Sequence, residues 1–113
     1  MLNKEGKENI QKIKNAAKKI WGDTCRFGKV EVLDAPFCMF NLPALMYEKY
    51  DIVMKYDRSI LDIAVKIENN DTWLANLTTD HVIEGFESCD LENLLHNFKI
   101  LDKVLRMMGV SKR

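Results

Sequence analysis

The segment from residue 50 to residue 68, YDIVMKYDRSILDIAVKIE, constrains the fold more than any other part of the chain. Hydrophobic and charged residues alternate on both sides of a central turn. In an antiparallel hairpin, Met54 would face Ile63 on an apolar side, and Lys55 would face Asp62 on a charged side. A shift by one residue would exchange the two faces and destroy both patterns. The segment therefore predicts a hairpin with one apolar face and one charged face.

The lengths of the turns are less clearly specified than the strands. The hairpin turns at 58–59, but Arg-Ser is a poor type I′ dipeptide, which makes a four-residue loop over 57–60 a plausible alternative with the same pairing. After the hairpin, a three-residue loop over 69–71 would place Trp73 on the apolar face, whereas a two-residue loop would place Asn76 there. Burying an unpaired amide is costly, so we predict the three-residue loop.

Amphipathic helices are predicted on both sides of these strands. Residues 8–21 carry apolar side chains at helical spacing, and Gly22 follows directly, as is typical of a helix end. Residues 91–108 carry a longer apolar stripe, and Gly109 is expected to end that helix. Each helix therefore needs an apolar surface on which to bury its stripe.

Two shorter strands complete the predicted architecture, at 24–33 with a bulge near Gly28 and at 81–86. The order of elements predicts an α+β protein built as a two-layer sandwich. In it, an antiparallel β-meander of four to five strands has the N- and C-terminal helices packed on one face, and the other face stays open. The length of 113 residues fits a single domain covering 1–113.

Composition and cysteine usage indicate where such a protein would work. The chain is 47% hydrophobic and 30% charged, which is typical of a soluble globular protein. It has no apolar run long enough to span a bilayer, and its first residues do not resemble a signal peptide. The three cysteines are widely spaced, as expected of reduced thiols rather than a disulfide framework. We therefore expect a cytoplasmic protein without a membrane partner.

The residue types that usually carry chemistry form no catalytic or ligand-binding motif. His81 and His96 lack the spacing of a metal site, and nothing places either of them beside Cys89, whose position near a helix start could lower its thiol pKa. The acidic stretch 80–92 lacks the spacing of a calcium loop, and no glycine-rich phosphate loop occurs. We therefore expect no enzymatic activity, no metal and no cofactor.

The segment PFCMFNLPALMY, residues 36–47, is unusually apolar for a connection between two strands. Asn41 and Pro43 favour a short helix that would run to about Glu48. Its apolar side chains would either close one end of the sandwich or form a surface for a partner protein or a second copy of the chain. The candidate partner-binding residues are Phe37, Met39, Phe40, Leu45, Met46 and Tyr47.

The charges are polarised although the net charge is zero, with basic ends and an acidic middle. If the helices lie side by side, their outer faces could form one basic patch for nucleic acid. The residues of this patch would be Lys12, Lys14, Lys18, Lys19, Lys99, Lys103 and Arg106. Lysine predominates, however, and arginine is the better reader of phosphates and bases.

Taken together, these features favour a non-enzymatic protein-binding module. The order of helix, antiparallel meander and helix recurs in small inhibitors, immunity proteins and chaperones, which is an analogy of shape alone. We expect an inhibitor or immunity-type protein that blocks a larger partner. A nucleic-acid-binding accessory protein is the alternative.

Overall fold

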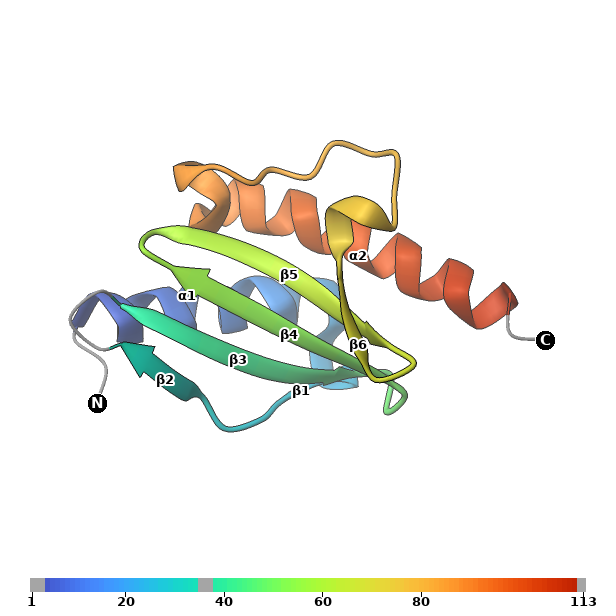
Figure 1. Ribbon diagram of the computed structural model, residues 1–113, viewed down its shortest axis with the longest axis horizontal. Helices are drawn as coiled ribbons and strands as arrows, with labels where there is room; N and C mark the ends of the chain where they lie inside the picture. Colours follow the sequence, from blue (N-terminus) through green and yellow to red (C-terminus); the bar gives the residue numbers. More distant parts are fainter. Residues whose placement is uncertain (1–3, 35–37, 112–113) are drawn as a thin grey trace.

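Strands and helices form two layers in the computed structural model, which describes residues 4–34 and 38–111 (Figure 1). The elements in chain order are α1 (Lys4–Trp21), η1 (Gly22–Thr24), β1 (Cys25–Phe27), β2 (Glu31–Asp34), β3 (Met39–Met46), β4 (Tyr50–Asp57), β5 (Ile60–Ile67), β6 (Asn70–Trp73), η2 (Leu74–Asn76), η3 (Phe86–Cys89) and α2 (Leu91–Ser111). Both long helices lie behind the sheet in Figure 1, on the same face of it. The protein is thus α+β, as predicted from the sequence.

The described strands form one antiparallel sheet in the order β1-β3-β4-β5-β6, with β2 also paired to β3. The β4–β5 hairpin has the predicted register, with Met54 opposite Ile63 and Lys55 opposite Asp62. Its turn consists of Arg58 and Ser59 alone, and both have positive φ, as a type I′ turn requires. The four-residue loop is therefore wrong. The apolar pairing of the strands outweighs the poor turn propensity of this dipeptide.

The turn into β6 is also shorter than predicted. It contains only Glu68 and Asn69, both with positive φ, so the three-residue loop is wrong. That choice assumed a longer strand, which would have buried an amide. Instead β6 ends at Trp73 and η2 turns the chain away, so Asn76 stays exposed outside the sheet. Trp73 consequently pairs with Ala64 on the face opposite the helices.

The predicted strand over 24–33 is split into β1 and β2, which both pair with β3. The break lies opposite Pro43, which has no N–H to donate to a neighbouring strand. The Gly28 N–H donates to the Pro43 carbonyl at 2.9 Å. A Cβ atom on Gly28 would lie only 3.0 Å from Cγ of Pro43, so glycine permits this close approach.

Residues 81–86 do not form the predicted strand. The segment from 77 to 85 is irregular and runs along α2. The backbone of Ile83 is bound by the side chain of Asn97, which accepts from its N–H at 2.9 Å and donates to its carbonyl at 3.0 Å. These side-chain contacts take the place of the strand pairing that was predicted for this segment from its apolar residues.

Within the apolar segment 36–47, the described residues form β3 (Met39–Met46), in the interior of the sheet, rather than a short helix, and residues 36 and 37 lie outside the described residues. Its side chains alternate in burial, with Leu42 and Ala44 facing the helices and Pro43 exposed on the opposite face. Pro43 had suggested the start of a helix. In the structure it occupies a strand position whose missing donor faces the break between β1 and β2.

The two helices meet over the inner face of the sheet. The rings of Trp21 and Phe98 lie 5.2 Å apart, and the Asn9 amide donates to the Tyr56 hydroxyl at 2.7 Å. α1 ends at Trp21, and Gly22 follows it with a φ of 57°, as predicted. α2 continues to Ser111, past its predicted end at Gly109, where an added Cβ would lie 2.8 Å from the Tyr50 hydroxyl.

Candidate functional site

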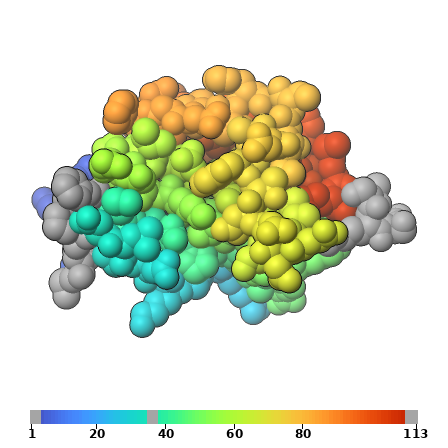
Figure 2. All heavy atoms as spheres, viewed as in Figure 1, coloured from blue at the N-terminus to red at the C-terminus, as the bar shows by residue number. Residues whose placement is uncertain are grey.

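A hollow of about 600 Å³ lies on the sheet face opposite the helices, and we call it the outer-face groove. Figure 2 views this face, with the green of β3 and β4 between the cyan of β2 and the yellow of β6. Its floor includes Pro43, Leu45 and Val53, and Pro43 and Val53 are direct neighbours across β3 and β4. Since Gly28 has no side chain, the break between β1 and β2 leaves this part of the floor uncovered.

Charged side chains of both signs form the rim of the groove. They are Arg26, Asp51, Lys55, Lys66 and Asp71. The Lys55 ammonium lies 3.2 Å from the Asp71 carboxylate and 5.3 Å from the centroid of the Trp73 ring. The predicted register, with Lys55 opposite Asp62, is confirmed for the backbone. The Lys55 ammonium, however, forms its ion pair with Asp71 of β6 rather than with Asp62.

The remaining rim charges differ in how far they are neutralised. Nη2 of Arg26 lies 2.9 Å from Glu48 Oε1 in an exposed pair. Asp51 and Lys66 take part in none of the ion pairs between described residues. The groove thus presents an apolar floor beside two charges of opposite sign that are free to meet a ligand. Such a surface suits a peptide or protein better than a polyanion.

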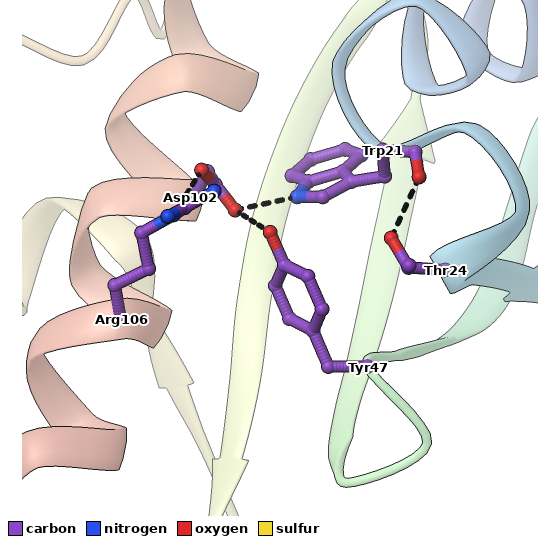
Figure 3. Close-up of polar contacts among 5 residues, drawn as sticks. All are labelled: Trp21, Thr24, Tyr47, Asp102 and Arg106. Carbon is purple, nitrogen blue, oxygen red and sulfur yellow. Dashed lines mark hydrogen bonds and ion pairs between the residues drawn. The ribbon is translucent and has the colours of Figure 1, made fainter.

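A second cluster joins α1, α2 and the β3–β4 turn around the carboxylate of Asp102 (Figure 3). Asp102 Oδ1 accepts hydrogen bonds from Trp21 Nε1 at 2.8 Å and from the Tyr47 hydroxyl. Oδ2 accepts from Arg106 Nε at 2.8 Å, and Thr24 donates to the Trp21 carbonyl at 2.7 Å. This cluster therefore connects three elements that are far apart in the sequence.

The electrostatics of Asp102 indicate a structural role. Burial alone would raise its pKa, but the donors Tyr47, Trp21 and Arg106 more than offset burial and hold the pKa below its ordinary value. Burial and the hydrogen bond to Asp102 raise the pKa of Tyr47. Both oxygens of the carboxylate are engaged, so the cluster fixes its neighbours in place. The sequence analysis missed it, although Asp102 is the sole acid in the otherwise basic stretch 93–113.

The predicted partner-binding residues do not form one surface. Phe40 and Met46 are fully buried against the helices, so the assignment of these two to a contact surface is wrong. Their alternation with half-buried Met39 and Leu45 places the two pairs on opposite faces of β3. Tyr47 is half-buried in the β3–β4 turn, where its hydroxyl binds Asp102. Phe37, the remaining candidate, lies outside the described residues.

Part of the predicted basic patch does come together. Lys12, Lys18 and Lys19 line a hollow of about 650 Å³ with Asn15 and Leu91, and we call it the lysine hollow. Its surface is largely aliphatic, because lysine stems make up much of it.

The other basic candidates are placed elsewhere. The Lys14 ammonium lies 5.9 Å from the centre of the Phe27 ring, on the side of α1 that faces β1. The Lys103 ammonium lies 3.2 Å from Asp80, and the Arg106 guanidinium is bound to Asp102. Lys99 is exposed on α2 but does not line the lysine hollow. The single basic patch expected from the sequence is therefore not assembled in full.

The cysteines and histidines take part in structural contacts. Burial raises the pKa of Cys25 and of Cys89 to about 11, so the helix start does not activate the Cys89 thiol. The His96 ring lies 2.7 Å from the His81 carbonyl through Nε2. Within residues 4–34 and 38–111, no three His, Cys, Asp or Glu side chains gather into a metal-binding group. In the same part of the chain, no helix has the length and apolar character needed to cross a membrane.

Comparisons of the chain with protein-family models, with curated proteins and with solved structures gave no match.

Proposed function

We propose that this protein is a non-enzymatic module that binds another protein through the outer-face groove. Its action would be that of an inhibitor or immunity-type protein, in which a small rigid domain blocks a larger partner. The observation that carries the proposal is the apolar floor over β3 and β4 within a rim of mixed charges. The helices bury the inner face of the same strands, while the described residues leave this floor open.

The chemistry of the groove suggests how a partner would bind. Pro43 and Val53 would contact apolar side chains of the partner, which supplies most of the affinity in protein interfaces. Lys66 would meet a carboxylate and Asp51 a basic group, because neither has an ion-pair partner among the described residues. Lys55 is already held by Asp71 and Trp73, so it would shape the rim rather than rearrange.

We place this activity in the cytoplasm. The support is that Cys25, Cys38 and Cys89 are all free thiols, which persist most readily in a reducing compartment.

Nucleic-acid binding remains the alternative proposal, supported by the gathering of Lys12, Lys18 and Lys19 in the lysine hollow. It is the weaker one, because Lys103 and Arg106 are paired with carboxylates. Retention of nucleic acid that falls steeply as salt is raised would favour it.

The test of the proposed function uses a photoreactive amino acid at position 53, with position 32 as a matched control. Val53 and Val32 are both partly exposed strand valines, but only Val53 lines the groove. After irradiation of expressing cells, a discrete protein adduct should form from position 53 and not from position 32.

The captured protein would then be purified and its affinity measured. We expect Val53→Arg to weaken binding by about tenfold or more, since a charge in the centre of an interface costs more than about 1.4 kcal/mol. Val32→Arg should leave the affinity within about twofold, a change of less than 0.5 kcal/mol. Equal adducts from both positions, or equal losses in both variants, would refute the assignment to the groove.

A further inference from the structure

We propose that two copies of this protein associate reciprocally, with Phe86 of each copy inserted into the lysine hollow of the other. This interface is separate from the outer-face groove and does not depend on the proposed function. It rests on two features of one molecule, an exposed aromatic projection and a nearby concave surface of complementary charge.

The projection is built from η3. Phe86 is the most exposed large hydrophobic residue in the described part of the chain, with 74% of its surface accessible. The carboxylate of Glu87 folds back over Gly85, where an added Cβ would lie 2.8 Å from Glu87 Oε2. Glu84 is also exposed on this segment. The aromatic ring is therefore presented among negative charges.

Hydrogen bonds hold the backbone of this projection in place. The hydroxyl of fully buried Ser88 accepts a hydrogen bond from the Leu61 N–H of β5 at 2.8 Å. The carbonyl of Glu87 accepts from the Asp90 N–H at 3.0 Å and from the Asn93 amide at 2.8 Å. These bonds fix the backbone of η3 that carries Phe86, so little backbone entropy is lost on binding, which favours the use of Phe86 as an anchor.

The lysine hollow matches this projection in both shape and charge. Its volume of about 650 Å³ exceeds that of a phenylalanine side chain, and Leu91, 44% exposed, lies in its wall. Lys12, Lys18 and Lys19 belong to none of the ion pairs between described residues. Their stems would contact the ring, and their ammonium groups would meet Glu87 and the ring face.

The positions of the two features favour a twofold dimer. Leu91 lies in the wall of the hollow, and only Asp90 separates it from the end of η3. The projection and the hollow are therefore neighbours on the surface. A self-complementary interface requires such proximity, because one twofold axis must pair both projections with both hollows. The charge contacts lie at the rim, so we expect a reversible dimer that weakens as salt is raised.

The first experiment is sedimentation velocity of the full chain over a range of concentrations at low and moderate salt. We expect a dimer whose population rises with concentration and falls with salt. Phe86→Ser should weaken the dimer by about tenfold or more, as expected for an interface anchor. The control Met107→Ser removes a side chain of similar exposure, 63%, outside the lysine hollow, and should leave dimerisation unchanged.

A charge exchange provides the decisive second experiment. Glu87→Lys and the double variant Lys18→Glu/Lys19→Glu should each be monomeric alone, because like charges then meet at both contacts. An equimolar mixture restores opposite charges at both contacts, so it should form a heterodimer whose dissociation constant is within a few fold of that of the wild-type dimer. Lys99→Glu is the control for a surface charge reversal and should dimerise normally. Circular dichroism would verify that every variant is folded.

Three results would overturn the proposal. They are a wild-type chain that stays monomeric throughout, a Phe86→Ser variant that dimerises as well as wild type, and a mixture that fails to recover the dimer. If the chain is monomeric and Lys18→Glu/Lys19→Glu instead abolishes salt-dependent binding to nucleic acid, the lysine hollow is a nucleic-acid site and the self-association model is wrong.

Discussion

The two faces of the sheet use the same strands for different purposes. On the inner face, β3 and β4 contribute Leu42 and Met54, which are fully buried beneath the helices. On the outer face, the intervening residues Pro43 and Val53 form the floor of an open groove. Burial of each large inner side chain contributes about 1.5–3 kcal/mol to folding. Since outer residues contribute less to stability, that face can vary its binding chemistry without loss of the fold.

A pair of adjacent residues tests this contrast most strongly. Met46 is fully buried on the inner face, whereas Leu45 is half-buried on the outer face of the same strand. Met46→Lys should destabilise the protein by about 4 kcal/mol or more, because a charge is buried without a partner. Leu45→Glu should cost about 1 kcal/mol. Chemical denaturation monitored by circular dichroism measures both, and a larger loss from Leu45→Glu would invert the face assignment.

The Asp102 cluster gives the next largest effect, on the helix side of the sheet. Asp102→Ala leaves the buried Trp21 N–H and the Tyr47 hydroxyl without their acceptor. We expect a loss of about 2 kcal/mol in the free energy of unfolding, in line with unsatisfied buried donors. Asp102→Asn, which keeps one acceptor oxygen, should lose less. Equal stability of Asp102→Ala and wild type would show that the cluster contributes nothing.

The pH dependence of stability should reflect the same carboxylate. The pKa of Asp102 is lower in the folded state than in the unfolded state, so ionisation favours folding. This contribution is complete above the unfolded pKa and is lost as the pH falls through the folded pKa. Denaturation between pH 7 and acid should therefore show a smaller acid-induced loss in Asp102→Asn than in wild type. An identical slope in both proteins would contradict this assignment.

Asp62, on the outer side of the sheet, should show the smallest effect, with the opposite sign. Burial raises its pKa, and the nearby carboxylates Glu84 and Asp57 raise it further, so the folded state disfavours the ionised form. The resulting destabilisation is present at neutral pH and is relieved as the pH falls toward the folded pKa. Asp62→Asn should thus gain a few tenths of a kcal/mol at pH 7, roughly the scale of exposed charge effects. A measurable loss in thermal melting would instead reveal a favourable partner for Asp62.

The sequence predicted strands best where their two faces differ in polarity. In β4 and β5 the alternation identified the register and the inner face correctly, and Lys55 was expected on the open side, where it lines the groove. β3 escaped detection because both of its faces are largely apolar, so alternation disappears. Pro43 also argued against a strand. The sheet accommodates this proline because β1 and β2 are interrupted opposite it, and that interruption is visible only in the structure.

Long-range contacts explain most of what the sequence could not supply. Arg26 and Asp71 join the rim of the groove through the register of β1 and β6, which depends on turns whose lengths were mispredicted or unknown. Asp102 meets Trp21 across 81 residues of chain, and no local pattern links those positions. The two-residue turn over 68–69, in which both residues have positive φ, was likewise hidden, because strand pairing rather than turn propensity selects it.

The contact between α1 and α2 has a consequence for how the protein is made. α1 leaves the ribosome before the sheet and α2, and the Asp102 carboxylate that binds Trp21 is synthesised only after the whole sheet. Until then, the apolar stripe of α1, including Ile13, lacks part of its final covering. Incompletely buried apolar surface is what chaperones bind. The nascent chain should therefore be a chaperone client, and release should follow emergence of α2.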